Sequence, residues 1–257
     1  MTRNADSQAL MTDTYVYDSA FQNMAATNSA YAASRIIAAV RIILPVRSVV
    51  DIGCARGTWL REWQTQSVDD VIGVDSDCVD QSKLEIDPRN FVVRDLAAPF
   101  NLGRQFDLVQ CLEVAEHLPV SRAASFIADL ARLAPVVLFS AATPGQGGEN
   151  HLNEQTGAYW QAHFRRLDYL AIDCLRPILA NEKRIPPWYR YNAIVYVRRD
   201  HIEQIASFAR QFQLDEAMEV RDLSPLTYRL RKRLVRMLPK AICNRLAHWN
   251  ARRFPES

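Results

Sequence analysis

The chain has 257 residues, of which 49% are hydrophobic and 23% are charged, and its formal net charge is +2. This composition is that of an ordinary soluble globular protein and excludes a low-complexity chain. The opening MTRNADSQALMTD lacks the apolar core of a signal peptide, and no stretch approaches the roughly 18 apolar residues of a membrane span. The five cysteines are odd in number and form no CxxC pair, which argues for reduced thiols in the cytoplasm rather than a disulfide framework or a zinc knuckle.

The predicted elements alternate between helices and short strands. A helix is predicted over residues 29–44, ended by Pro45, and helix-compatible stretches follow at 57–66, 78–85 and 121–133. Short apolar runs rich in β-branched residues predict strands at 48–53, 70–75, 91–95, 106–112, 136–142, 169–175 and 192–200. They lack in/out alternation, as strands covered on both faces do. We therefore expect a doubly wound, mostly parallel sheet with helices on both faces.

The segment SVVDIGCARGTWL leads from a buried strand into a helix through two glycines. The strand reaches Asp51, and Gly53 and Gly57 let the backbone approach a ligand at the start of the next helix. This is a Rossmann-like arrangement, but the spacing D-x-G-x-x-x-G lacks the third glycine of the dinucleotide fingerprint. A pyrophosphate favours that denser turn, whereas a sulfonium nucleoside has no phosphate and does without it.

Two further aspartates follow the second and third predicted strands. Asp75 is placed to accept hydrogen bonds from both ribose hydroxyls of a nucleoside. Asp95 is placed to receive an adenine amino group while Leu96 covers the ring. Taken singly, each aspartate could equally be a turn residue. Together with the glycine turn, the three predict one cofactor site at the carboxyl edge of the sheet.

These residues resemble the class I S-adenosylmethionine-dependent methyltransferases. Asp51-x-Gly53 is similar to their first motif, Asp75 to the ribose-binding acid, Asp95–Leu96 to the adenine contact, and FDLVQCLEVAEHL to the fourth-strand motif. The resemblance covers residues 29–200 and implies a Rossmann-like sheet of seven strands, with NAIVYV antiparallel. It also assigns Cys54, Ala55, Ser76 and Leu112 to the cofactor site. The family usually has glycine at Ala55, so its methyl group is expected to crowd the methionine end of the cofactor.

The stretch EVAEHLP places three titratable groups directly after the fourth strand. In a helical turn, Glu113, Glu116 and His117 lie on one side. In one interpretation His117 is a general base for an acceptor hydroxyl, with Glu113 and His151 as further catalytic groups. In the other, the residues hold Mg²⁺ or Mn²⁺. This second interpretation follows a resemblance of E-x-x-E-H to quinone-biosynthesis O-methyltransferases and small-RNA 3′-terminal 2′-O-methyltransferases, which implies metal ligands at Glu113, Glu116, His117 and His151. Structural roles alone remain an alternative, with Glu116 solvated and His117 hydrogen-bonded.

The segment 140–164 has polar and aromatic residues where an acceptor would bind. Asn153, Gln155, Tyr159 and Trp160 are candidates to contact sugar hydroxyls and rings, although Trp160 and Phe164, four residues apart, also fit the buried face of a helix. The pattern from YDSAF through HLNEQ and YW to WYRYN resembles bacterial methyltransferases of exopolysaccharide and lipo-chitooligosaccharide (nodulation-factor) pathways. That resemblance implies a carbohydrate acceptor, such as a fucosyl group.

The chain beyond residue 200 is predicted to be helical and, toward its end, basic. From residue 221 onward ten Lys/Arg stand against two acids. An apolar stripe at steps of four and three, divided by Pro239 into two helices, comprises Leu226, Leu230, Leu234, Leu238, Ile242, Leu246 and Trp249. The bases suit an anionic membrane surface at its cytoplasmic face, or RNA phosphates. The leucine spacing favours packing on the domain or on a partner subunit.

The sequence predicts three regions: an N-terminal arm (1–28), a methyltransferase domain (29–200) and a C-terminal helical extension (201–257). The favoured function is O-methylation of a hydroxyl on a small molecule, carbohydrate or glycan, with S-adenosylmethionine as donor and no DNA partner. One alternative is methylation of a quinol, a catechol or an RNA ribose with the metal site predicted at E-x-x-E-H. The other is a non-catalytic S-adenosylmethionine-binding module.

Overall fold

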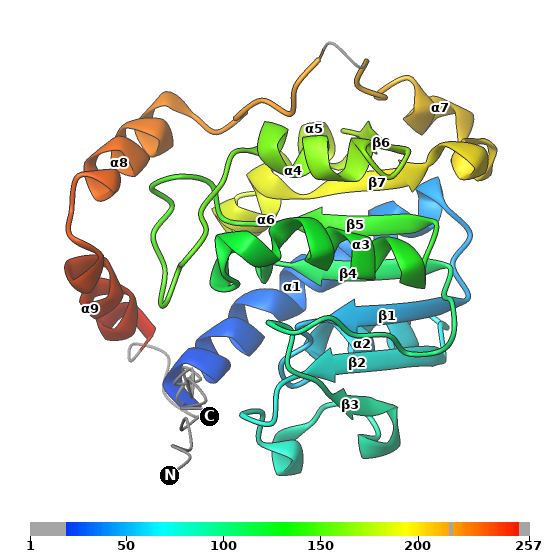
Figure 1. Ribbon diagram of the computed structural model, residues 1–257, viewed down its shortest axis with the longest axis horizontal. Helices are drawn as coiled ribbons and strands as arrows, with labels where there is room; N and C mark the ends of the chain where they lie inside the picture. Colours follow the sequence, from blue (N-terminus) through cyan, green and yellow to red (C-terminus); the bar gives the residue numbers. More distant parts are fainter. Residues whose placement is uncertain (1–18, 216–217, 252–257) are drawn as a thin grey trace, which may run out of the picture.

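A computed structural model describes residues 19–215 and 218–251. The arm predicted for 1–28 therefore lies largely outside the described residues. Seven strands form one sheet in the order β3-β2-β1-β4-β5-β7-β6 (Figure 1). They are β1 (Ser48–Ile52), β2 (Asp70–Asp75), β3 (Phe91–Val93), β4 (Leu108–Leu112), β5 (Val136–Ser140), β6 (Tyr169–Ile172) and β7 (Ile194–Arg198). Only β7 runs antiparallel to its neighbours, so the predicted seven-stranded, mostly parallel sheet is confirmed.

Helices pack on both faces of this sheet. The α-helices are α1 (Ser19–Ile43), α2 (Thr58–Thr65), α3 (Ala123–Leu133), α4 (Gly157–Arg165), α5 (Leu175–Leu179), α6 (Pro187–Asn192), α7 (Ser207–Arg210), α8 (Leu226–Arg236) and α9 (Lys240–Ala251). The 3₁₀ helices are η1 (Gln81–Lys83), η2 (Pro88–Asn90), η3 (Ala115–His117), η4 (Val120–Arg122) and η5 (Arg199–Gln204). In Figure 1, α1 lies behind the sheet and α3 in front of it. No helix of the described ranges has the length and apolar character needed to span a bilayer.

The core consists of two apolar clusters, one on each side of the sheet. One is formed with α1 and α2, where Ile36 and Trp63 are fully buried. The other is formed with α3 and α4, where Phe126 and Phe164 are fully buried. Strand β4 is buried at every position, because helices cover both of its faces. This explains why its sequence does not alternate.

The prediction of a helix over residues 78–85 is wrong, because only the short 3₁₀ helix η1 forms there. The side chain of Asp80 accepts a hydrogen bond from the Ser82 amide at 3.0 Å, and Leu84 is already extended. Such a local side-chain hydrogen bond competes with continuation of an α-helix. Strand β3 is also shorter than predicted, because it ends at Val93.

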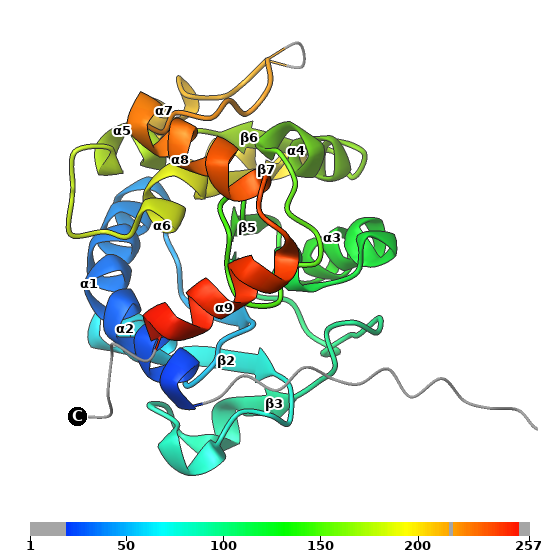
Figure 2. The same ribbon diagram turned by 90° about the vertical axis from the view of Figure 1, so that its left-hand side faces the viewer.

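The parallel strands bring the predicted site to one edge. Asp51 lies beside Gly73 of β2 and Gln110 of β4, so β1, β2 and β4 end close together. Helices α8 and α9 lie on this carboxyl side of the sheet, as the two views show together (Figures 1 and 2). Helices α8 and α9 therefore lie at the ends of β1, β2 and β4, although more than a hundred residues separate them from these strands in the sequence.

Candidate active site

The turn between β1 and α2 requires glycine at two positions. Gly53 has a φ of +81° and Gly57 one of +84°, a region that side chains with a Cβ disfavour. A Cβ on Gly53 would also come within 2.3 Å of Val114 Cγ2. The same turn holds Ala55 at a φ of +47°, so the residue that replaces the usual glycine adopts a left-handed conformation. The turn passes close to β2, where the Gly53 amide donates to the Val74 carbonyl at 2.8 Å.

Asp75 is held at the end of β2 by two backbone amides. Its Oδ2 accepts from Ala55 N at 2.7 Å, and its Oδ1 accepts from Ser76 N at 2.7 Å. Burial raises the pKa of Asp75, and these two hydrogen bonds oppose the rise. Each carboxylate oxygen keeps a second lone pair, so the side chain has acceptor capacity left for ribose hydroxyls.

Asp51 is the most deeply buried of the three aspartates, with 3% of its surface exposed. Burial raises the pKa of Asp51 to about 7; the amide of the neighbouring Gln110 opposes this, and the nearby Asp75 adds to it. Asp95 differs, because it lies two residues beyond the end of β3 and is exposed. Its Oδ1 accepts from Ala97 N at 2.8 Å, and the following Leu96 is buried.

A cavity of about 1200 Å³ opens at this edge of the sheet. It exceeds the roughly 300–1,000 Å³ of a pocket for one drug-sized ligand, so donor and acceptor can share it. Nine of the ten predicted cofactor residues line it, and Gly57 instead supports the turn. The nine are Asp51, Gly53, Cys54, Ala55, Asp75, Ser76, Asp95, Leu96 and Leu112.

The turn that follows β4 differs from the predicted helical turn. Only residues 115–117 are helical, as the 3₁₀ helix η3, and Glu113 precedes it with a φ of +57°. The Glu113 carboxylate accepts from Gln146 Nε2 at 2.6 Å and from Asn192 Nδ2 at 3.3 Å. Burial raises the pKa of Glu113, while these hydrogen bonds and one from Ser140 oppose the rise. Glu113 thus binds the neighbouring loop and helix α6.

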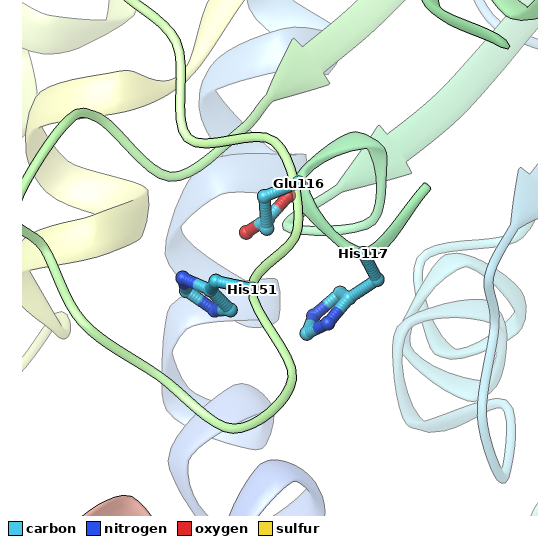
Figure 3. A group of neighbouring side chains, drawn as sticks. All are labelled: Glu116, His117 and His151. Atoms are coloured by element: carbon cyan, nitrogen blue, oxygen red, sulfur yellow. The ribbon is translucent and has the colours of Figure 1, made fainter. Parts of the chain in front are cut away.

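Three other predicted residues do converge. Ligand atoms of Glu116, His117 and His151 all lie within 4.8 Å of one another, and Figure 3 shows the three side chains turned toward one space. Glu113 is outside this group. Glu116 is completely buried, and neither of its oxygens accepts a well-formed hydrogen bond from the described part of the chain. Burial first, and then the charge of Glu113, raises the pKa of Glu116 well above its usual value.

The two histidines are oriented by separate acceptors. His117 Nδ1 lies 3.3 Å from the Asn150 carbonyl oxygen, which can only accept, so Nδ1 carries the proton and Nε2 the lone pair. Burial, followed by the charge of His151, lowers the pKa of His117 to about 3. The two imidazole rings meet edge to face with their centroids 4.9 Å apart.

Glu154 is a site residue that the sequence analysis did not single out. Its Oε1 lies 2.8 Å from His151 Nδ1. It also accepts from the amides of Gly145 and Gly147, at 2.7 and 2.9 Å. Burial tends to raise the pKa of Glu154, but these hydrogen bonds outweigh it, so the pKa lies below its usual value. Its position three residues after His151 in HLNEQ is the sequence signal that could have revealed it.

The loop of His151 is tied to η3 through main-chain atoms. The Glu116 carbonyl oxygen accepts from both the Leu152 amide and the Asn153 amide, each at 2.8 Å. Together with the contact between His117 and Asn150, these hydrogen bonds fix the loop against the turn after β4.

The sequence profile of methyltransferase domains matches residues 24–224, more than three quarters of the chain. The chain belongs to this methyltransferase family. Its Rossmann-like fold and its family match agree with an S-adenosylmethionine-dependent methyltransferase. Among curated protein sequences, none is significantly similar to it.

Solved structures share the fold of this methyltransferase. The sugar N-methyltransferase KedS8 from Streptoalloteichus sp. is 17% identical, with a TM-score of 0.54, over 77% of this chain and 100% of that one. A putative O-methyltransferase from Nostoc punctiforme is 15% identical, with a TM-score of 0.52, over 69% and 58% of the two chains. DesVI from Streptomyces venezuelae is 22% identical, with a TM-score of 0.43, over 52% and 62%. The methyltransferase thus spans about three fifths of the length of the last two proteins.

The four predicted acceptor residues of the methyltransferase do not line the cavity. Trp160 is buried in the core beside Phe139, as the helix-face alternative required. Asn153 is also buried, and its Oδ1 accepts from Gln155 Nε2 at 2.9 Å. Tyr159 contacts the rings of Trp160 and His163 instead. These residues shape the domain near the loop, so the sequence prediction of their direct acceptor contact is not supported.

The C-terminal helices of the methyltransferase cover the cavity instead. The cavity lining includes Tyr228, Arg231 and Val235 of α8 and Cys243, Leu246, Ala247 and Trp249 of α9. Arg231 Nη1 donates to the Gln146 carbonyl at 3.0 Å, and the Asn150 amide donates to Asn244 Oδ1 at 3.3 Å. Both contacts reach the loop of His151. The sequence analysis favoured packing of these helices on the domain or on a partner subunit, but it did not place them at the cofactor cavity.

Proposed function

We propose that the protein transfers the methyl group of S-adenosylmethionine to a hydroxyl of a carbohydrate or glycan acceptor. The observation that carries this proposal is the convergence of Glu116, His117 and His151 on the cavity that the predicted cofactor residues also line. Such a cluster beside a methyl donor suits an acceptor that loses a proton as it is methylated.

The chemistry is a direct displacement at the methyl carbon. The acceptor oxygen forms a bond to the methyl group while the bond from carbon to sulfur breaks, and S-adenosylhomocysteine leaves. The hydroxyl proton goes to a base, and His117 presents the lone pair of Nε2 for this purpose because Nδ1 is committed to Asn150. The Nδ1 atom of His151 likewise faces an acceptor, the Glu154 carboxylate.

The same three residues also fit a divalent cation. The donor set consists of two imidazole nitrogens and a buried carboxylate whose oxygens accept no well-formed hydrogen bond. Of the two ions predicted, this mixed nitrogen and oxygen set favours Mn²⁺ over Mg²⁺, which prefers oxygen ligands. A bound cation would polarise the acceptor hydroxyl and lower its pKa. Glu113 lies outside this group of ligand atoms, and its carboxylate accepts hydrogen bonds from Gln146 and Asn192.

A carbohydrate suits the rest of the cavity lining. Trp188, Tyr228 and Trp249 offer aromatic faces for the apolar side of a sugar ring. Glu149 and Asn150 add polar groups for its hydroxyls. This mixture of a few polar groups among aromatic surfaces is typical of small-molecule sites.

The test is transfer of label from labelled S-adenosylmethionine to separate fractions of sugar nucleotides, glycolipids, catechols and RNA. We expect label in a carbohydrate fraction and loss of at least roughly 100-fold in rate for His117→Ala, with donor binding by calorimetry unchanged. His163→Ala, on helix α4 outside the cavity lining, is the matched control. Label only in catechols or RNA would refute the acceptor class, and donor binding without any transfer would indicate the non-catalytic alternative.

A chelator distinguishes the two proposed roles of Glu116, His117 and His151, which are proton transfer without metal and binding of a divalent cation. If a cation takes part, EDTA abolishes transfer and Mn²⁺ restores it. Full activity in chelator leaves His117 as the general base without metal.

A further inference from the structure

Helix α8 packs with its polar side inward. Lys232 has 6% of its surface exposed, and its Nζ donates to Asp222 Oδ2 at 2.5 Å and to Thr143 Oγ1 at 3.1 Å. The helix backbone sits so close to the loop that a Cβ on Gly145 would lie 2.1 Å from the Lys232 carbonyl oxygen. Tyr228 and Val235, on the same side as Lys232, line the cavity. The inward side of α8 is therefore fully engaged.

The outward side of α8 is apolar. It consists of Leu226, Leu230, Leu234 and Met237, which are 71%, 55%, 67% and 81% exposed; we call these four residues the outer face. The sequence analysis favoured packing of these leucines on the domain or on a partner subunit; they do not pack on the described part of the domain, and packing on a partner stays a prediction. An amphipathic helix normally buries its apolar side. A contiguous exposed set of this kind marks an interaction surface.

Arginines flank the outer face along one side. Arg229, Arg233 and Arg236 lie at steps of four and three residues, beside the leucines on the helix surface, and all three are exposed. Residues 223–251 contain seven Lys/Arg and no Asp or Glu. The charged side chains that α8 itself presents beside the outer face are therefore all basic.

We propose that the outer face of α8 docks on the surface of an anionic lipid membrane. The helix would lie in the plane of the interface, with its leucines and Met237 among the acyl chains and its arginines on the phosphates. No described helix is long and apolar enough to span a bilayer, so the contact is peripheral. Since the inward side of α8 lines the cavity, docking brings the cavity close to the lipid.

Charge complementarity favours a membrane over other occupants. In a two-fold contact between copies of this chain, the arginine rows would face one another without acids to pair with. A nucleic acid would pair with the arginines but would leave the four large apolar side chains in water. Of these three occupants, the membrane, with negative head groups and an apolar interior, satisfies both parts of the surface.

The test is sedimentation of the full-length protein with large vesicles, either of phosphatidylcholine alone or with about 30% phosphatidylglycerol. We expect binding to the anionic vesicles that weakens in high salt. The variant L226S/L230S/L234S should bind at least roughly tenfold more weakly. R229Q/R233Q/R236Q should lose binding similarly, by removing the electrostatic part. The control I42S/I178S/F208S changes three exposed apolar residues elsewhere and should bind as wild type does.

Several results would overturn the proposal. One is absence of wild-type binding to anionic vesicles, and another is unchanged binding of the leucine variant. A third is a wild-type dimer in sedimentation velocity that the leucine variant converts to monomers, which would assign the outer face to a second copy. Tight RNA binding that needs the arginines but not the leucines, without vesicle binding, would assign it to nucleic acid. All substituted side chains are exposed, and an unchanged unfolding temperature checks that each variant folds.

Discussion

Replacing Asp51 with asparagine should change how stability depends on pH. The Asp51 carboxyl is almost entirely buried at the end of β1, and its pKa of about 7 lies far above the ordinary value of 3.8. Asparagine has nearly the same shape and no charge to desolvate. The substitution therefore removes the ionisation and keeps the packing.

The size of the effect follows from the two pKa values. Each pKa unit corresponds to about 1.4 kcal/mol, so a difference of about three units amounts to about 4 kcal/mol at pH values above both. Between them the folded protein binds more protons than the unfolded chain, so stability falls as pH rises. The contribution of Asp51 to the free energy of unfolding is fully present below about pH 4 and is lost as the pH rises through about 7. Roughly 3 kcal/mol of the loss falls between pH 5 and pH 8.

The measurement is urea unfolding of the cofactor-free protein at several values from pH 5 to pH 8. The difference in unfolding free energy between D51N and wild type reports on the Asp51 carboxyl together with its effect on the neighbouring Asp75, because the other buried carboxyls are the same in both proteins. We expect the variant to gain about 3 kcal/mol on wild type across this range. D95N is the matched control, since its carboxyl is exposed to water. A difference that stays constant with pH would refute the reasoning and show that water reaches Asp51.

Three further substitutions test the site. Gly148→Ala would place a Cβ 2.1 Å from His151 Nε2, so we expect at least a tenfold loss in kcat with an unchanged donor Kd. Ala55→Gly relieves a left-handed residue and should raise stability by up to about 1 kcal/mol and tighten donor binding in calorimetry. Lys232→Met leaves the half-buried Asp222 without its cation. It should lower the free energy of opening α8 by on the order of 2 kcal/mol, seen as faster thermolysin cleavage beyond residue 222; unchanged cleavage would contradict this role.

The sheet was predictable because each strand is a short apolar run, and the central strands are covered on both faces. The register then brings Asp51 and Asp75 to one edge, as the sequence indicated. Asp95 proved exposed, because β3 ends two residues earlier than its apolar pattern suggested. Ala55 was singled out as unusual from the sequence, and its positive φ gives that departure a physical meaning.

The candidate site was predictable in part. Glu116, His117 and His151 converge as expected, but the helical turn that would have added Glu113 does not form. A left-handed residue at Glu113 turns the chain, and hydrogen bonds from two distant amide side chains then fix its carboxylate. Such partners lie 33 and 79 residues away along the chain, where no local pattern reveals them.

The orientation of α8 could not be predicted from its periodicity. A stripe of leucines at steps of four identifies an apolar side, but the pattern does not say what covers it. Here the interior accommodates Lys232, because Asp222 and Thr143 provide oxygen atoms for its ammonium group. One lysine among seven bases thus determines which side of the helix faces the cavity.

The carbonyl oxygen of Glu116, which holds two successive amides of the neighbouring loop, has a consequence for how this site can change. The frame that sets the separation of the two imidazoles is built from peptide groups, which every amino acid supplies. Residues 117 and 151 can therefore be exchanged for others while that frame persists. Evolution or a protein engineer could alter the reaction type at this position without rebuilding the scaffold.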